Sequence, residues 1–450
     1  MRRKSVILLP ALCFACHFLQ AGETNAIDPA RLAYQLETTV TAYDKIGVKN
    51  PKWDGDAKDC LTLFARVRSL TNGGPAELLN ELKAKLPHLS ALGCEDPLIR
   101  YLDTRFTFSD THSAGQTAGA VGNMASSLQK SQYPAIRKFY GTVWWHVALA
   151  NAAQKEPAGR LLLEEAAAYL AQALDDKTTP LYETDEACDR LMSASWWAEP
   201  TRWNCYRIIE PALAKHWEGT SLALLTKGRA YLSYAWQARG TGYADSVSEN
   251  SQKLMVERLD TAATALEAAW KLDPHDARIC REMTRVELGQ GQGRERMETW
   301  FQRGMKIDPA NYDICCEKLE YLRPRWYGSI KEMIEFGREC TANTNWAGQV
   351  RLMLVDAHYE ASREIQDDRQ RAAYWKQPAV WRDIQSTYDQ YFKLYPKESS
   401  FRQYYALNAA RCGKVQEFAT QIKLAPTTNY ELFGGVERFN RMIKLAKDQH

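Results

Sequence analysis

The sequence lacks several features that would assign a function at once. Its 450 residues carry 58 basic and 55 acidic side chains, so no broad cationic surface for nucleic acid is expected. None of the eight histidines has another three or four residues away, which excludes a two-imidazole metal clamp on a helix. Alternating strand patterns are nearly absent. We therefore expect no metal, no cofactor and no nucleic-acid partner.

Long apolar runs are also missing, apart from one short run at the start that resembles a signal peptide. Met1–Lys4 is basic, residues 5–19 are mostly apolar, and Ala21 ends a small-residue cleavage site before Gly22. This run is shorter than the roughly 20 residues of a spanning helix, so no integral membrane segment is expected after cleavage. Removing residues 1–21 takes away three basic groups and leaves 55 of each sign. We expect a periplasmic or secreted protein with a net charge near zero.

Nine of the 11 cysteines lie beyond this leader. In an oxidising compartment most of them should pair, although the sequence does not set the connectivity. An odd number leaves at least one thiol free or paired between chains, so a homo-oligomer is possible.

Helical periodicity covers almost the whole chain. Asp28 is a cap followed by Pro29 at the first helical position, and Gly47 ends the predicted helix. Residues 111–131 are rich in Gly, Ala and Ser and read as a loose linker or weak helix. The predicted organisation is a signal peptide at 1–21, an N-terminal helical region at 22–110, this linker, and a helical repeat domain at 132–450, with repeats clearest at 220–345.

An internal repeat supports that organisation. Residues 271–280 (KLDPHDARIC) align with 306–315 (KIDPANYDIC), with five identities in ten positions and an offset of 35. A period near 34 indicates paired helices. Upstream of Pro274, Ala269, Leu266 and Ala262 place small, bulky and small residues where close helix pairs need them, and in the second unit Gly304 matches while Met297 does not.

These residues resemble a degenerate tetratricopeptide repeat. The resemblance implies an all-α fold, a right-handed α-solenoid of antiparallel helix pairs. The segments 235–240 (AWQARG) and 321–329 (YLRPRWYGS) are also similar to a bacterial family of helical-repeat proteins whose function is unassigned.

The repeat also suggests a disulfide. Cys280 and Cys315 each follow the repeat proline by six residues, so they should occupy equivalent places on consecutive helices. We expect a bridge from Cys280 to Cys315 or to the adjacent Cys316, with Cys340 as a further candidate.

The sequence shows no catalytic or nucleotide-binding motif. The Gly289–Gly293 segment has neither a preceding strand nor a following Gly-Lys-Ser or Gly-Lys-Thr, so it is predicted to be an interhelical turn. On a helix, His358 points away from both Asp356 and Glu360, so the three cannot grip one ion. No catalytic residue is nominated.

The remaining candidates are arginines beside aromatic rings. Most of the 14 Trp and 22 Tyr residues should be packing residues. A turn, however, can present arginine and aromatic side chains to carboxylates, peptide termini, sugars or cations. The ligand-binding candidates are Arg239, Arg323, Arg325, Trp326 and Tyr327.

Three functions are consistent with these observations. The first is an exported helical-repeat scaffold that binds a protein or peptide through a concave surface. The alternative is a helical toroid, enzyme or binder, that acts on cell-wall or other polysaccharide, with Glu199, Asp245 or Glu249 as candidate carboxylates. The third is a self-assembling envelope protein.

Overall fold

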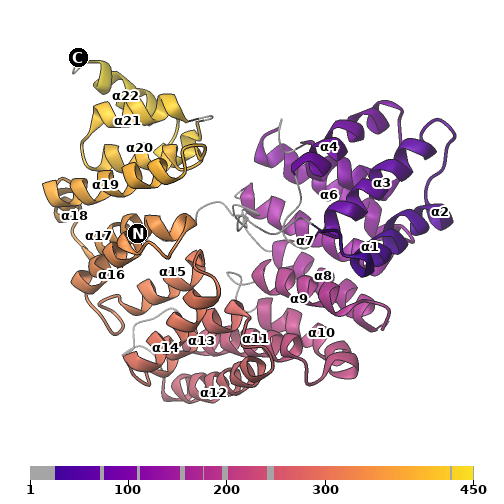
Figure 1. The fold of residues 1–450 in the computed structure, drawn as a ribbon, viewed down its shortest axis with the longest axis horizontal. Coiled ribbons are helices and arrows are strands. Elements are labelled where there is room, and N and C mark those ends of the chain that lie inside the picture. Colours follow the sequence, from indigo (N-terminus) through magenta and orange to yellow (C-terminus); the bar gives the residue numbers. More distant parts are fainter. Residues whose placement is uncertain are drawn as a thin grey trace. The chain divides into compact units, whose positions relative to one another are not determined.

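Helices make up nearly all of the structure. The computed structural model describes residues 26–70, 76–108, 112–152, 158–175, 177–194, 201–240, 248–425 and 428–448, and the predicted signal peptide lies outside these ranges. Within them the chain forms no β-strand, only an isolated antiparallel bridge between Ile27 and Leu70 (Figure 1). None of the described helices is long and apolar enough to cross a membrane. The all-α helical-repeat prediction is confirmed.

Contacts between helices divide the chain into two compact units, which meet in sequence between Leu272 and Asp273. Unit 1 begins with a helix whose middle turn is a π-helix and which comprises α1 (Pro29–Leu36), the π segment (Glu37–Thr41) and α2 (Ala42–Ile46). It continues with α3 (Asp54–Arg68), α4 (Ala76–Ala91), α5 (Pro97–Phe106), α6 (Ala114–Lys130), α7 (Ala135–Asn151), α8 (Ala158–Asp175), α9 (Leu181–Ala194), α10 (Thr201–Trp217), α11 (Ser221–Arg239) and α12 (Glu249–Leu272).

Unit 2 contains the remaining helices. They are α13 (Ala277–Gln290), α14 (Arg294–Ile307), α15 (Tyr312–Tyr321), α16 (Ile330–Ala342), α17 (Met353–Glu364), α18 (Asp368–Trp375), α19 (Pro378–Leu394), α20 (Arg402–Arg411), α21 (Val415–Leu424) and α22 (Val436–Asp448). Short 3₁₀ segments lie at Gly348–Leu352 and Tyr430–Phe433. In both units most helices pack against their sequence neighbours, as in α11 with α12, α13 with α14, and α20 with α21.

Capping side chains and glycines that can be read from the sequence set the ends of several helices. The Asp28 carboxylate accepts hydrogen bonds from the backbone N–H groups of Ala30 and Arg31, and Gly47 follows the last helical residue as predicted. At the repeat turns, Asp276 caps α13 and Asn311 caps α15 in the same way. Gly291 ends α13 in the left-handed conformation, so residues 291–293 form an interhelical turn as predicted, while Gly289 and Gln290 are the last residues of α13.

Close packing at small residues holds the helix pairs together. In unit 1, Ala262, Leu266 and Ala269 are completely buried on α12, and a Cβ atom on Gly228 of α11 would lie 2.5 Å from the Leu266 Cγ. In unit 2, a Cβ atom on Gly304 would lie 2.3 Å from the Ile314 Cδ1 and 3.0 Å from the Cys280 Cβ. The small-residue positions read from the repeat are therefore contact points between helices.

The segment predicted as a loose linker or weak helix is mostly a packed helix, α6. Its Val121, Met124 and Leu128 are buried, and a Cβ atom on Gly122 would lie 2.8 Å from the indole nitrogen of Trp145. The small residues that suggested looseness let α7 approach closely. The division between compact units falls at Leu272 instead of in this segment.

The cysteines do not form the expected bridge. All nine beyond the leader, including Cys280, Cys315, Cys316 and Cys340, are free thiols in the structure. The Cys315 sulfur faces the Met305 sulfur at 3.6 Å, while Cys280 lies against Gly304 of α14, the helix that follows its own. Cys280 and Cys315 hold equivalent positions in successive repeats, but they pack against different residues of α14.

Candidate functional site

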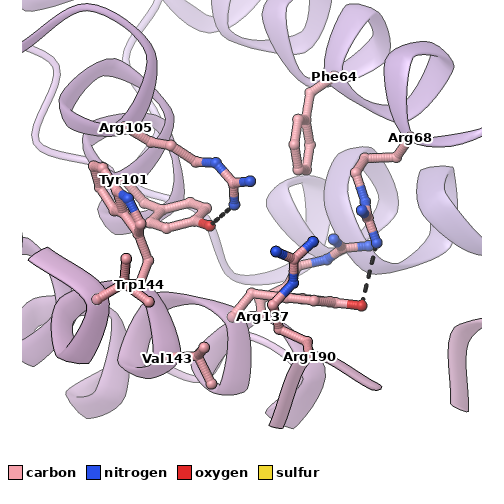
Figure 2. Close-up of a pocket in the computed structure, with 10 residues that line it drawn as sticks. Phe64, Arg68, Tyr101, Arg105, Arg137, Val143, Trp144 and Arg190 are labelled. Atoms are coloured by element: carbon pink, nitrogen blue, oxygen red, sulfur yellow. Dashed lines mark hydrogen bonds between the residues drawn. The ribbon is translucent and has the colours of Figure 1, made fainter. Parts of the chain in front are cut away.

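A pocket in unit 1 collects arginines and aromatic rings. Four helices supply them: α3, α5, α7 and α9. The rings are those of Phe64, Tyr101, Tyr140 and Trp144, and Figure 2 shows arginine guanidinium groups gathered between them. The arginines are Arg68, Arg105, Arg137 and Arg190, and none of the described acidic residues lines the pocket.

Helical spacing places the pocket residues of α3, α5 and α7 on one face of each helix. On α7, Arg137, Tyr140, Trp144 and Val147 are separated by three, four and three residues, so they share one face. The same rule joins Phe64 to Arg68 on α3 and Tyr101 to Arg105 on α5, each four residues apart. The sequence contained this signal on α3, α5 and α7, but only the fold brings these helices together with Arg190 of α9.

Arg68 is the arginine whose charge is balanced. Its guanidinium pairs with Glu186 and lies 3.4 Å from the carboxylate of Glu183, and it donates to the Tyr140 hydroxyl at 3.2 Å. Burial would raise the pKa of Glu186, but Arg68, assisted by Arg190 and Arg105, lowers it overall. The carboxylates of Glu183 and Glu186 are therefore both engaged by Arg68.

Arg137 is different because its guanidinium is buried and no carboxylate contacts it. Only 2% of the residue is exposed. One terminal nitrogen donates to the Gln35 Oε1 at 2.6 Å and to the Thr38 hydroxyl, and the Nε–H has no hydrogen-bond partner. Among the described residues Arg137 makes no ion pair.

The π-helical turn of the first helix orients the neutral partners of Arg137. Thr38 donates its hydroxyl proton to the Tyr34 carbonyl at 2.9 Å, and Thr39 donates to the Gln35 carbonyl at 2.6 Å. The Gln35 amide donates to the Glu183 carboxylate at 2.7 Å. This last bond fixes the amide so that its oxygen faces Arg137. Single π turns of this kind are frequent at functional sites.

Arg105 likewise has only neutral and aromatic contacts in the part of the chain that the structure describes. It donates to the Tyr101 hydroxyl at 2.5 Å, a bond drawn in Figure 2, and its guanidinium lies 5.3 Å from the Phe106 ring centroid. Arg105 and Arg137 are therefore two positive charges at one pocket without a counter-ion in contact. Such an arrangement suits an anionic ligand.

The sequence-predicted site residues are not gathered into one pocket. Arg239 is the last residue of α11 in unit 1, with its guanidinium 5.9 Å from the Trp236 ring centroid. Arg323, Arg325, Trp326 and Tyr327 lie in the turn after α15 in unit 2. Buried Arg323 binds Glu320, Glu360 and Glu364 at 2.6–3.0 Å, so it stabilises the turn, and its role in ligand binding stays a prediction.

The other three turn residues are more exposed but are also engaged. Arg325 and the Trp326 indole both donate to Glu320, the indole at 2.9 Å. Tyr327 donates to the Leu288 carbonyl at 3.2 Å and covers Gly291. Their role in ligand binding stays a prediction.

Of the carboxylates named for polysaccharide chemistry, Glu249 alone lies in the part of the chain that the structure describes. Glu199 and Asp245 lie outside the described residues, and Glu249 is exposed at the start of α12. On α17, Asp356 accepts from the Tyr312 hydroxyl at 3.1 Å, whereas His358 contacts Asp383 at 3.1 Å and Tyr374 at 2.7 Å. The helical spacing predicted this divergence.

Comparison with models of protein families gives no match, and neither does comparison with curated proteins. Solved structures that resemble the chain include a human IFIT1 dimer with m7Gppp-AAAA, at a TM-score of 0.40 and 12% identity over 88% of this chain and 77% of that one. A human IFIT1 dimer with PPP-AAAA gives 0.37 and 12% over 87% and 77%, and a monomeric IFIT1 mutant with m7Gppp-AAAA gives 0.40 and 12% over 87% and 75%. TM-scores this low carry no functional argument.

Proposed function

We propose that this protein is a helical-repeat binding scaffold whose unit 1 pocket holds a negatively charged group of a protein or peptide partner. We further propose that it is tetratricopeptide-like, because small residues mark the helix contacts in both units, and that it works in the periplasm or outside the cell. The expectations that nucleic acid is not a partner and that the chain can form homo-oligomers stay predictions.

The uncompensated charge of Arg137 carries this proposal. A buried cation without a counter-ion is costly, by several kcal/mol in real proteins. Native structures retain such a group where it has a task, and perturbed charges in a pocket are a recognised mark of functional sites. An incoming anion would supply the missing negative charge and an acceptor for the Nε–H.

The walls of the pocket support a ligand with an apolar part next to the anion. Phe64, Tyr101 and Tyr140 are at most 8% exposed, and Trp144 and two valines complete the lining. Rings in such a pocket bury apolar surface while the guanidinium groups fix orientation. This combination of arginines and aromatic rings favours the binding of an anion that carries an apolar part.

Two probes of matched shape and opposite charge test the proposal. We expect benzoate to bind the full chain in titration calorimetry and benzylamine to give no heat. Arg137→Met should weaken benzoate binding by about tenfold or more, the size of a lost charged hydrogen bond. Arg100→Gln, at a half-exposed arginine on α5 that pairs with Glu95, is the control and should bind benzoate as the unchanged chain does. Equal binding of benzylamine, or an unaffected Arg137→Met variant, would contradict an anion-binding pocket.

The compartment requires its own test. Alkaline phosphatase fused after residue 30 should be active when residues 1–21 direct export and inactive when Leu8 and Leu9 are both replaced by Arg. Activity that is independent of the apolar run would rule out export by this leader.

A further inference from the structure

The structure points to a metal site in unit 2: we propose that the sulfur atoms of Met305, Cys315 and Cys340 bind one Cu(I) ion. This inference goes beyond the proposed function, concerns other residues and does not depend on it. The expectation that no metal is bound was drawn from the spacing of histidines on single helices. That spacing does not test sulfur donors that three different helices bring together.

Three helices that follow one another in the chain each supply one sulfur. Met305 lies in the last turn of α14, Cys315 in α15 and Cys340 in the last turn of α16. The Cys315 sulfur lies 3.6 Å from the Met305 sulfur, and the Cys340 thiol shares a side-chain hydrogen bond with the Cys315 thiol. Cys315 is therefore in contact with both of the other donors. Both cysteines are free thiols, so neither sulfur is used in a disulfide.

The separation of the sulfurs suits a shared ion. A first-row metal ion bonds to cysteine sulfur at about 2.3 Å, so the sulfurs of a planar three-coordinate site lie about 4 Å apart. The 3.6 Å between the Met305 and Cys315 sulfurs is close to that distance. An ion between these two atoms requires only a small shift of the pair, and the unbranched, flexible side chain of Met305 can make it.

The donor set selects the kind of ion. Thiolates and thioethers are soft ligands, which favour Cu(I) over ions that prefer oxygen. Structural Zn²⁺ takes four ligands from Cys, His, Asp and Glu. Among the described residues, no three side chains of these types are grouped so that they could hold a metal ion. With Met305 as the third donor the set is two thiols and a thioether, and this composition points to Cu(I).

Burial also suits a Cu(I) ion. Cys315 and Cys340 are completely buried and Met305 is 2% exposed. Exclusion of water protects the ion from oxidation to Cu(II), which prefers nitrogen and oxygen ligands in a square-planar arrangement. Binding replaces both thiol protons, so one Cu⁺ and two thiols give a bis-thiolate complex and two protons, with no change in oxidation state. The ion reaches the sulfurs when unit 2 opens locally.

Titration of the reduced full chain with Cu(I), without oxygen, tests the site. We expect the chain to take one equivalent of Cu(I) from a colorimetric copper chelator. X-ray absorption by the copper of this complex should show three sulfur neighbours at about 2.3 Å.

Variants that remove one donor at a time identify the ligands. Cys340→Ala should weaken Cu(I) binding by at least about a hundredfold and Met305→Leu by at least about tenfold, because loss of groups that only support a metal ligand already costs about 10- to 100-fold. The matched controls are Cys205→Ala and Met124→Leu, at buried sulfurs of unit 1, and both should bind Cu(I) as the unchanged chain does. Far-UV circular dichroism and melting temperature show that each variant folds.

The outcomes separate a built site from binding by thiols in general. Retention of the Cu(I) equivalent by Cys340→Ala, or an equal loss in Cys205→Ala, would overturn the inference. A copper spectrum with only two sulfur neighbours would also overturn it, and that measurement requires no variant to fold. Benzoate binding should be the same with and without Cu(I), since the pocket residues belong to unit 1. The anion pocket and the copper site can therefore each fail alone.

Discussion

Two arginines, one in each unit, are equally buried and differently surrounded. Arg323 of unit 2 is 6% exposed and lies among the carboxylates of Glu320, Glu360 and Glu364. Arg137 of unit 1 is 2% exposed and contacts Gln35 and Thr38 instead. The first arrangement balances the charge of Arg323 with carboxylates of the same chain and holds a turn together. In the second, no carboxylate among the described residues contacts the Arg137 guanidinium. Burial alone therefore does not distinguish support from function, but the counter-ions do.

Unit 2 has an uncompensated group of its own, and it has the opposite sign. Asp356 contacts the Tyr312 hydroxyl but makes no ion pair within the described residues. Burial, with a smaller contribution from nearby Glu360, raises the pKa of Asp356 to about 7 even though the hydrogen bond from Tyr312 lowers it. A buried carboxylate can take up a proton and become neutral, while an arginine stays charged. The unpaired carboxylate of unit 2 can therefore be neutralised by a proton, whereas the Arg137 guanidinium of unit 1 stays charged.

The largest expected effect is on the supporting arginine. Arg323→Met should destabilise unit 2 by about 3–5 kcal/mol, because three carboxylates would be left close together around an apolar side chain. Urea unfolding of the full chain, followed by circular dichroism, measures the loss. A change below about 1 kcal/mol would show that Arg323 is not the support that its ion pairs suggest.

The unpaired carboxylate should make stability depend on pH. The pKa of Asp356 is higher in the folded protein than its usual value of 3.8, so its contribution to stability is full below about pH 4 and is lost as the pH rises through about 7. About 3 kcal/mol should disappear over that interval, since each pKa unit corresponds to about 1.4 kcal/mol and the side chain is only partly shielded.

Asp356→Asn isolates this effect from other titrating groups. The difference in unfolding free energy between Asp356→Asn and the unchanged chain should vary between pH 4 and pH 8 and be constant outside that range. The groups around Asp356 that also titrate are Tyr312, Cys316, Glu360 and Tyr388. A difference that does not vary with pH would show that Asp356 is ionised throughout.

Packing should matter equally in both units, which sharpens the contrast in their polar groups. Gly304→Ala in unit 2 and Gly228→Ala in unit 1 should each cost about 1–3 kcal/mol, because the new methyl groups would collide with Ile314 and Leu266. Gly55→Ala on α3 meets no atom within 4 Å and should be neutral or stabilising by up to about 1 kcal/mol. Thermal melts of the three variants make the comparison.

The smallest expected effect is on the arginine of the pocket. Without ligand, Arg137→Met should change stability by no more than about 1 kcal/mol, because removal of an unbalanced buried charge offsets the hydrogen bonds lost at Gln35 and Thr38. The same urea unfolding measures it. A loss as large as that of Arg323→Met would make both arginines structural supports and would end the contrast on which the pocket's function rests.

Local patterns in the sequence were sufficient for the helices. The caps at Asp28, Asp276 and Asn311 and the stop at Gly47 depend on neighbours within a few residues, so they are readable in one dimension. The small residues at 262, 269 and 304 likewise predicted close helix pairs. The Gly- and Ala-rich segment at 111–131 was harder, because small residues occur both in loose linkers and in tightly packed helices such as α6.

The site could not be read in this way. The turn at Arg323–Tyr327 drew attention because its arginines and rings are adjacent in sequence, yet its buried arginine is paired with Glu360 and Glu364, about 40 residues further along. The pocket draws on α3, α5, α7 and α9, which span more than 100 residues. The pairs on α3 and α5, such as Tyr101 and Arg105, are unremarkable by themselves, and α9 contributes Arg190 alone.

The sequence by itself thus determined the helices, their ends and their repeated pairing, because hydrogen-bonding caps and the 3.6-residue period act over short distances. Only the tertiary structure decided which charges are balanced. Whether a buried guanidinium has a carboxylate beside it depends on helices that are distant in the chain. That difference separates Arg323, which holds a turn, from Arg137, whose hydrogen-bond partners among the described residues are neutral.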